Sequence, residues 1–345
     1  MKIKLPKDVH ILKGGKEFSL IDENIGKILK NRSLAKLCKK IGLVLKIKSG
    51  LIIRSIKKDR EKNFKKIYDV EVAFGDGFPF FYVSAGNSRK KIAWMHSDVL
   101  EKDYSARYYK QLKKILPEMN LCIAVSDKVS ESYQKKYRVK RITVINNVIN
   151  DQEIIEKAEI NENVSFDNEQ LNFISVGRLD YSKNYEMLFR VVKRLIDEGY
   201  DFKTYIVGDG AERENLNAMI KKYNMADSFI LLGKKDNPYP YVKKSDLFLL
   251  SSRYEGLPTV IIEALILHVP CLSTEVAGIH EILNNSIGVI SKNDEEKFYI
   301  ELKKLLDDKE KIKRLKDNLK DYKYDNESII ESVEKILDDA GVINE

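Results

Sequence analysis

The strongest constraint on the fold is a regular alternation, after residue 170, of short apolar runs with amphipathic stretches of helical length. Parallel strands need a long crossover between them, usually a helix, so this alternation is typical of a doubly wound, parallel α/β sheet. The predicted strands are 172–176, 202–207, 229–232, 247–251, 270–273 and 288–290. The predicted helices are 184–198, 212–223, 259–268, 296–306 and 327–338.

The first half of the chain is less regular but contains the same two kinds of segment. Its predicted strands are 9–12, 69–74, 92–95, 121–125 and 142–145, and its predicted helices are 104–116 and 128–137. A chain of 345 residues is long enough for two domains of about 150 residues each. We therefore expect two Rossmann-like domains, residues 1–150 and 151–345, that face each other across a ligand-binding cleft. The acidic stretch 150–170 would join them, and the last helix would belong to the second domain.

The charge is divided unequally between these halves. Residues 1–150 hold 34 Lys and Arg against 15 Asp and Glu, whereas the remainder holds 27 against 38, so a net charge of +8 hides +19 and −11. Residues 27–66 alone carry +13, and their apolar residues recur at helical spacing with lysines opposite. Three interpretations stay open: a solvated helix face, attraction to anionic lipid headgroups, or contact with a nucleic-acid backbone. The last is disfavoured because Phe64 is the only aromatic residue in that segment.

Several classes of protein are excluded or disfavoured. No apolar run approaches the roughly 18 residues of a membrane span, and the first residues lack the apolar segment of a secretory signal, so we expect a cytoplasmic protein. Cys38, Cys122 and Cys271 are far apart and odd in number, which favours reduced thiols over disulfides or a metal site. No Asp-x-Asp occurs, so a metal bound to a diphosphate has no obvious ligands.

The sharpest motif begins with Glu255, at the carboxyl end of a predicted strand, where open α/β sheets bind ligands. Gly256 permits a tight turn with close approach of the backbone. Pro258 suits the first position of the next helix, so the free amides of Thr259 and Val260 would point into the cleft as an anion site.

The helix that follows is apolar on nearly all sides except at Glu263. An ionised carboxylate in such surroundings is costly unless it is paired or binds a ligand. Either an arginine or backbone partner satisfies Glu263, or this residue belongs to a binding site.

Two further motifs follow strand ends. Gly177 and Arg178 end one predicted strand and Lys183 starts the next helix, so the two cations could hold a pyrophosphate. Residues 208–210, Gly-Asp-Gly, form a turn that a flat ligand could approach closely. Each pattern alone also occurs in ordinary strand-to-helix loops.

Taken in order, these motifs resemble those of the family 4 retaining glycosyltransferases of GT-B fold, and especially the bacterial capsule and exopolysaccharide enzymes. The resemblance covers residues 68–340. Its residues are Gly177-Arg178 with Lys183, Gly208-Asp209-Gly210, Leu232-Gly233, and Glu255 and Glu263 around Gly256-Leu257-Pro258. In the first half, 68–74, 91–98 and 145–147 also resemble that subset.

The resemblance implies a role for each motif. Arg178 and Lys183, beside Gly177, would hold the diphosphate of a nucleotide sugar and stabilise its departure, and the amides of Thr259 and Val260 would meet the phosphates. The base would lie against the loops that contain Gly208, Asp209, Gly210, Gly233 and Lys234.

The sugar side of the donor is implied in the same way. Glu263 would accept hydrogen bonds from the ribose hydroxyls. Glu255, helped by the backbone of Gly256 and Leu257, would bind hydroxyls of the donor sugar. His96 would face the sugar from the first domain, although a single histidine could equally be structural.

The implied reaction is transfer from a nucleotide sugar, a UDP-sugar being the first expectation, to a lipid-linked saccharide at the inner face of the membrane. The leaving phosphate would help to deprotonate the acceptor hydroxyl, so we expect neither metal nor cofactor. The alternative is a non-catalytic or activating subunit of a partner glycosyltransferase. Donor base, sugar, acceptor and linkage are left open.

The beginning of the chain departs from the family pattern. Members open with an apolar strand and a glycine-rich loop, whereas here Gly14-Gly15 follows the strand predicted at 9–12, which resembles a later strand of the family's first domain. We therefore expect a first domain without its initial βα units, whose sheet edge could accept a partner chain.

Overall fold

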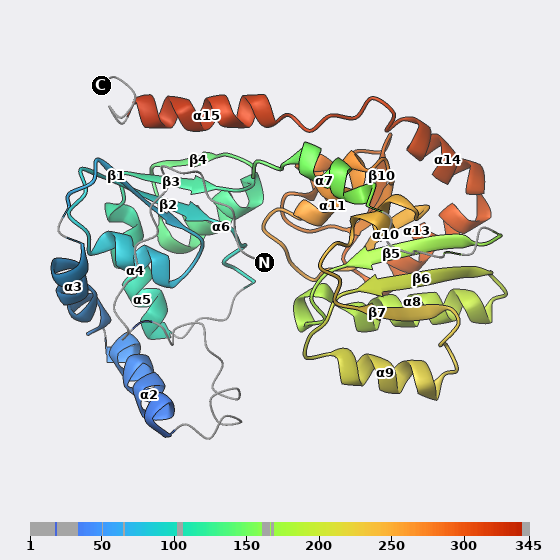
Figure 1. Ribbon diagram of the computed structural model, residues 1–345, viewed down its shortest axis with the longest axis horizontal. Helices are drawn as coiled ribbons and strands as arrows, with labels where there is room; N and C mark the ends of the chain where they lie inside the picture. Colours follow the sequence, from blue (N-terminus) through green and yellow to red (C-terminus); the bar gives the residue numbers. More distant parts are fainter. Residues whose placement is uncertain are drawn as a thin grey trace.

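The computed structural model describes residues 18, 34–49, 51–64, 66–101, 106–160, 166 and 169–339. Within these residues the chain forms two parallel sheets flanked by helices (Figure 1), so the predicted α/β fold is confirmed. The strand predicted at 9–12 lies outside the described residues. None of the described helices is long and apolar enough to cross a membrane.

The larger sheet has six parallel strands in the order β10-β9-β8-β5-β6-β7. They are β5 (Leu171–Val176), β6 (Phe202–Val207), β7 (Phe229–Gly233), β8 (Leu247–Leu250), β9 (Cys271–Thr274) and β10 (Gly288–Ser291). The chain builds outward from β5 to β7, returns to β8 on the other side of β5, and builds outward again. The reversal between β5 and β8 is the point where such sheets bind ligands.

Helices cover both faces of this sheet. On one face α8 (Tyr185–Asp197) and α13 (Glu295–Asp307) pack against Phe173, Phe202 and Leu249. On the other, α11 (Thr259–Ile266) packs against β8 and β9. The remaining elements are η2 (Tyr181–Lys183), α9 (Arg213–Lys222), α10 (Tyr239–Lys243), α12 (Ile279–Ile282) and α14 (Lys309–Asp317).

The stretch 150–170, predicted to be a polar connection, contains the helix α7 (Asp151–Ala158). Asn150 caps its first turn by accepting a hydrogen bond from the backbone N–H of Glu153 at 3.0 Å. Ile154 and Ala158 are buried against α10 and α11. Glu153 and Glu156 are exposed on the outer face of this helix, which packs on the second domain.

The smaller sheet has four parallel strands in sequence order. They are β1 (Val70–Phe74), β2 (Lys90–Met95), β3 (Leu121–Ala124) and β4 (Ile142–Val144). Its other elements are α2 (Leu34–Ser49), α3 (Ile52–Asn63), α4 (Phe78–Ser84), α5 (Ala106–Ile115), η1 (Leu116–Glu118) and α6 (Asp127–Tyr137). Among the described strands β1 is at the edge, with Val72 42% and Phe74 64% exposed.

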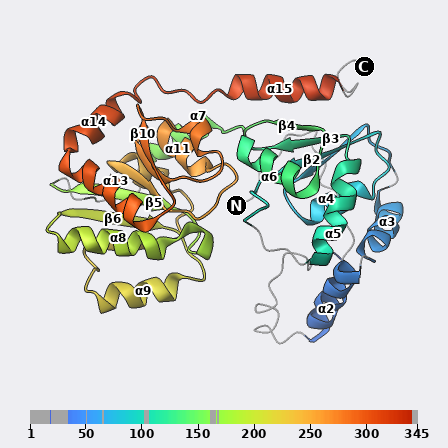
Figure 2. The same ribbon diagram turned by 180° about the vertical axis from the view of Figure 1, so that it is seen from behind.

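The last helix, α15 (Asn326–Asp338), packs on the first sheet, not on the second domain to which the sequence assigned it. Figures 1 and 2 show α15 on one side of this sheet, with α4, α5 and α6 on the other. Ile329, Val333 and Ile336 cover Ile92, Ile123 and Ile145. An amphipathic helix is defined by its own apolar face, which does not say which sheet it covers.

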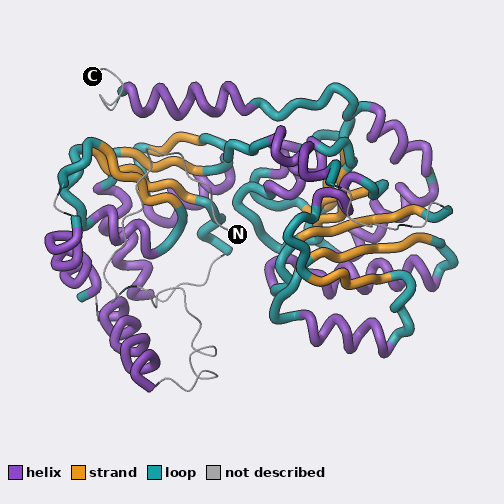
Figure 3. The backbone as a smooth tube through the Cα atoms, viewed as in Figure 1, coloured by secondary structure: helices purple, strands orange, loops and turns teal. Residues whose placement is uncertain are grey.

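The chain therefore crosses between the domains twice, and the crossings lie side by side (Figure 3). The side chain of Asn326 accepts from Ile149 N–H at 2.9 Å and donates to Ile149 O at 2.7 Å. The hydroxyl of Tyr324 donates to Asn147 O at 2.9 Å. Hydrogen bonds thus tie the outgoing segment to the returning one.

Helix α2 turns apolar residues in two directions. Leu43 is buried, whereas Leu34 is 77% and Leu45 59% exposed, with Ile41 between them on the same side of the helix. The sequence predicted an apolar face opposite the lysines. In the structure Leu34, Ile41 and Leu45 form an apolar stripe that faces solvent.

Candidate functional site

The centre of the candidate site is an ion pair at the carboxyl ends of β5 and β8. Lys183 Nζ donates to Glu255 Oε1 at 2.6 Å, and Ser252 Oγ donates to the same oxygen at 2.7 Å. Both charged side chains are largely buried. Ser251 Oγ donates to the carbonyl of Lys183 at 2.8 Å. The two residues singled out from different motifs therefore meet, and two serines of the β8 loop hold them in place.

Glycines form a tightly packed floor beside this pair. A Cβ at Gly208 would overlap the carbonyl oxygen of Gly177, and one at Gly210 would overlap that of Leu179. Gly208 N–H donates to Gly233 O at 3.0 Å. The three strand-end loops predicted to contact the donor thus touch one another, and only glycine fits at these positions.

The other charged residues predicted here lie outside the ion pair. Arg178 is 82% exposed at its side chain and lies 3.2 Å from Asp180. Asp209 accepts from Arg213 Nη1 at 3.0 Å, and Lys234 is exposed after β7.

Glu263 lies in α11 between Ile262 and Ala264, both buried. Burial raises the pKa of the Glu263 carboxyl to about 7. Within the described residues its side chain has neither a hydrogen bond nor an ion pair with a basic group. The interpretation that an arginine or backbone partner satisfies Glu263 therefore finds no support, and the carboxylate is available to ligand hydroxyls.

The start of α11 differs from the prediction. Pro258 is the residue before the helix, not its first, and the Thr259 N–H donates to Leu257 O at 2.9 Å. Pro258, at φ −76° and ψ 83°, is the central residue of the tight turn that closes this bond. The Thr259 amide is therefore used within the chain, and Val260 is the remaining one of the two predicted phosphate-binding amides.

The two domains meet at the same place. A Cβ at Gly256 would overlap the carbonyl oxygen of His96, and Ser126 Oγ donates to Gly256 O at 2.8 Å in a buried position. The loop that contains Glu255 is therefore in direct contact with the carboxyl ends of β2 and β3. This contact brings the backbone of His96 next to the Glu255 loop from the side of the first domain.

Aromatic rings surround the His96 imidazole. Phe74 lies 4.5 Å and Trp94 6.5 Å from it, centroid to centroid, and Phe74 and Trp94 are 5.3 Å apart. Asp76 Oδ1 accepts from His96 N–H at 3.2 Å and from the Tyr133 hydroxyl at 2.8 Å. The ends of β1 and β2 are thus fixed to α6.

Sequence reasoning missed Asp76, Ser126 and Glu281. Glu281 bridges the domains, because its two oxygens accept from Asp127 N–H and from Asn146 Nδ2, each at 2.9 Å. For Asp76, the glycines on both sides of a residue after a strand were a usable signal. The partners of Ser126 and Glu281 depend on domain packing, which leaves no local pattern.

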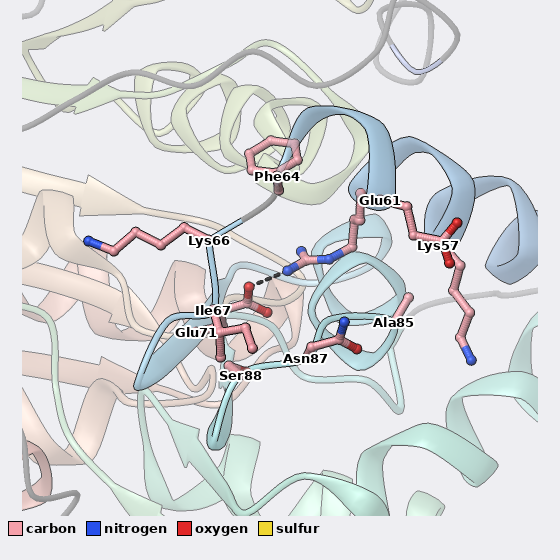
Figure 4. Close-up of a pocket in the computed structure, with 10 residues that line it drawn as sticks. Lys57, Glu61, Phe64, Lys66, Ile67, Glu71, Ala85, Asn87 and Ser88 are labelled. Atoms are coloured by element: carbon pink, nitrogen blue, oxygen red, sulfur yellow. Dashed lines mark hydrogen bonds and ion pairs between the residues drawn. The ribbon is translucent and has the colours of Figure 1, made fainter.

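A cavity of about 180 Å³ lies apart from this site, between α3 and the start of β1 (Figure 4). Arg60 and Glu71 form a largely buried ion pair at its floor. A Cβ at Gly86 would overlap Glu71, so this glycine allows the pair to pack against the backbone. Glu71 thus neutralises the charge of Arg60, one of the cations of the basic segment 27–66.

No metal centre is found in the part of the chain that the structure describes: no three His, Cys, Asp or Glu side chains are grouped as ligands.

Comparisons with known proteins agree with the fold and the motifs. Residues 156–322 match the family described as "Glycosyl transferases group 1". This match agrees with the resemblance predicted from the motifs of the second half of the chain.

Relatives and solved structures extend the match. The chain is 30% identical over 223 residues to an uncharacterized glycosyltransferase of Methanocaldococcus jannaschii, which covers 60% of this chain and 54% of that protein. It is 34% identical over 150 residues to the N-acetylgalactosamine-N,N'-diacetylbacillosaminyl-diphospho-undecaprenol 4-alpha-N-acetylgalactosaminyltransferase of Campylobacter jejuni, covering 43% and 40%. The chain thus spans about half or less of these relatives.

The Anabaena protein HepE, solved in complex with UDP, superposes with a TM-score of 0.68 at 14% identity, covering 84% of this chain and 82% of that one. This likeness establishes the GT-B fold.

Proposed function

We propose that this protein transfers a sugar, with retention, from a UDP-sugar to a saccharide acceptor. The observation that carries the proposal is the buried Lys183–Glu255 pair at the β5–β8 reversal, beside a floor of glycines and in contact with His96. A cation for a diphosphate and a carboxylate for sugar hydroxyls lie together where an α/β sheet binds ligands. Residues 151–345, apart from α15, would bind the donor, and residues 1–150 would bind the acceptor.

The proposed mechanism uses the leaving group as the base. The bond between the anomeric carbon and the β-phosphate oxygen breaks, and the acceptor oxygen bonds to that carbon from the same face. The acceptor proton passes to the departing phosphate. Lys183, already oriented by Glu255, and Arg178 stabilise the charge that develops on the diphosphate.

The remaining roles follow from position. Glu263 would accept hydrogen bonds from the ribose, with the base against the loops after β6 and β7. Val260 N–H would meet the phosphates at the start of α11. His96, which touches the Glu255 loop, would align acceptor and donor sugar.

We also propose that the reaction needs no metal, since Lys183 and Arg178 supply positive charge at the diphosphate. Turnover in EDTA equal to turnover in Mg²⁺ is the expected result. Loss of turnover in EDTA, restored by Mg²⁺ or Mn²⁺, would contradict it.

The acceptor is proposed to be a lipid-linked saccharide at the inner face of the membrane, as in capsule or exopolysaccharide synthesis. The apolar stripe of α2 suits insertion into a lipid surface, and the lysines elsewhere on the same helix suit anionic headgroups. The Campylobacter relative is named for a substrate linked to diphospho-undecaprenol.

The decisive experiment is titration calorimetry with UDP. Wild-type chain should bind UDP, and Glu263→Ala should bind it at least about tenfold more weakly, because the ribose hydroxyls lose their acceptor. Glu310→Ala, which removes an exposed carboxylate on α14 outside the site, is the matched control and should leave UDP binding unchanged. Unchanged binding in Glu263→Ala would refute the site.

A non-catalytic or activating subunit is the second candidate, favoured by the exposed edge strand β1, on which a partner chain could pair. Sugar transfer by the purified chain alone, compared with transfer in the presence of the product of a neighbouring gene, separates the two functions.

A further inference from the structure

The face of the first sheet opposite α4, α5 and α6 is only partly covered. α15 packs on Ile92, Ile123 and Ile145, and Val70 of β1 belongs to the same cluster, but within the described residues Val72 and Phe74 of β1 are left exposed on this face. Val72 and Phe74 point to it together because side chains two apart in a strand share a face. A Phe that is 64% exposed at the end of a strand needs an explanation, because it enlarges apolar surface in water.

The position of Phe74 supplies one. It is in register with Trp94 on β2, and its ring lies 5.3 Å from the indole and 4.5 Å from the His96 imidazole. The carbonyl of His96 in turn touches Gly256, next to Glu255. Phe74, Trp94 and His96 therefore form a continuous row of rings that ends at the Gly256 loop of the donor site, and the exposed Phe74 ring is its outer end.

The chemistry of the row suits one class of ligand. A sugar ring has an apolar face of C–H groups and an edge of hydroxyls, so it packs flat on an aromatic ring while its hydroxyls reach polar groups beside it. Here Phe74 and Trp94 supply the apolar surface, and His96 and Asp76 lie next to it, towards the Gly256 contact.

We propose that Phe74, supported by Trp94, is a stacking platform for a pyranose ring of the acceptor, at the outer side of the His96 site. The proposal deepens and rests on the proposed transfer function, in which His96 faces the reacting sugar. Phe74 would hold the acceptor ring and His96 would align its hydroxyl. Val72 would extend the apolar surface along β1.

The chain carries its own reporter, because Trp94 is the only tryptophan in the sequence. Its fluorescence therefore reports on the surroundings of a single position, in contact with Phe74. We would titrate wild-type chain, saturated with UDP, with glucose, galactose, N-acetylglucosamine and N-acetylgalactosamine. At least one should change the Trp94 emission in a saturable way.

Substitutions test whether the change in Trp94 emission depends on Phe74. Phe74→Ala should weaken the effective saccharide by about tenfold or more, and Phe74→Tyr should preserve its affinity. Ile67→Ala is the matched control, since Ile67 is 65% exposed on the same domain but outside the row. UDP affinity, measured by calorimetry, should be the same in all three variants.

The outcomes separate this proposal from the function on which it rests. If wild-type chain fails to bind UDP, the proposed function fails. If UDP binds but no saccharide affects Trp94 up to its solubility limit, or Phe74→Ala binds it equally well, the platform is refuted. Loss of a dimer in Phe74→Ala, seen by sedimentation, would assign the exposed ring to a second copy of the chain and likewise overturn the proposal.

Discussion

The Glu263 carboxyl combines two properties that make its ionisation measurable. Burial raises its pKa to about 7, and it is placed to accept hydrogen bonds from a ribose, which the ionised form does better. We predict that UDP affinity rises between about pH 6 and about pH 8 by more in wild type than in Glu263→Gln. Calorimetry across this range tests it, and identical pH profiles would contradict it.

The same group should make folding stability depend on pH. Its pKa is about 7 in the folded chain and near the ordinary 4.5 when unfolded, so on raising the pH the unfolded state loses its proton first. Stability contributed by the neutral form is therefore present below about pH 4.5 and is lost as the pH rises to about 7. Glu263→Gln should gain stability over wild type at about pH 8 but not at about pH 4.5, in urea unfolding; an equal difference at both would contradict the shifted pKa.

The buried Arg60–Glu71 pair beside the cavity allows a prediction about the unfolding free energies of single and double variants. Arg60→Met leaves the Glu71 carboxylate without its cation and should cost about 3 kcal/mol of unfolding free energy. The double variant Arg60→Met/Glu71→Leu should recover most of that loss, because no buried charge is left. Urea denaturation of the three proteins decides it: an unchanged single variant, or a double variant as unstable as the single, would disprove it.

At the scale of the element, the outward stripe of α2 predicts membrane binding. Leu34→Ser/Ile41→Ser/Leu45→Ser should reduce sedimentation with vesicles that contain anionic lipid, because the stripe supplies the apolar area. Lys36→Glu/Lys39→Glu/Lys40→Glu should reduce it too, more strongly at low salt. Neutral vesicles are the control, and unaltered binding in both variants would rule out α2 as the contact.

The secondary-structure elements that could be predicted were those with a clear hydrophobic periodicity in the sequence. The strands and long helices after residue 170 were found within a few residues, because short apolar runs alternate there with amphipathic stretches. Phe78–Ser84 escaped because a continuous apolar run does not distinguish a short buried helix from a strand. α7 escaped because its acidic face resembles a connection, although Asn150 and Glu153 already formed a capping pattern.

The site was predictable to the extent that local sequence determines it. Lys183 and Glu255 each follow a strand, and the carboxyl ends of adjacent parallel strands meet, so their contact followed from the fold. The contact of Gly256 with His96 depends on how two domains pack, which periodicity does not contain. The Thr259 amide was misassigned because a turn closed a bond that helix-start rules leave open.

At the scale of the whole molecule, the hydrogen bonds of Glu281 to Asp127 and Asn146 are expected to hold the two domains together. Glu281→Ala removes the acceptor of Asp127 N–H and of Asn146, while the buried apolar contacts within each domain remain. The radius of gyration without ligand should increase, with unchanged circular dichroism, and UDP should partly reverse the increase. Small-angle scattering measures this, and an unchanged radius would show that Gly256 and Ser126 suffice.

The paired crossings between the domains have a mechanical consequence. A single connecting segment would leave the domains free to swivel in any direction, as on a ball joint. Two parallel segments, joined by the hydrogen bonds of Asn326 and Tyr324, allow bending about one axis and resist rotation about the others. The two domains should therefore open and close by a hinge motion about a single axis, so that Glu255 and His96 separate and return along one path.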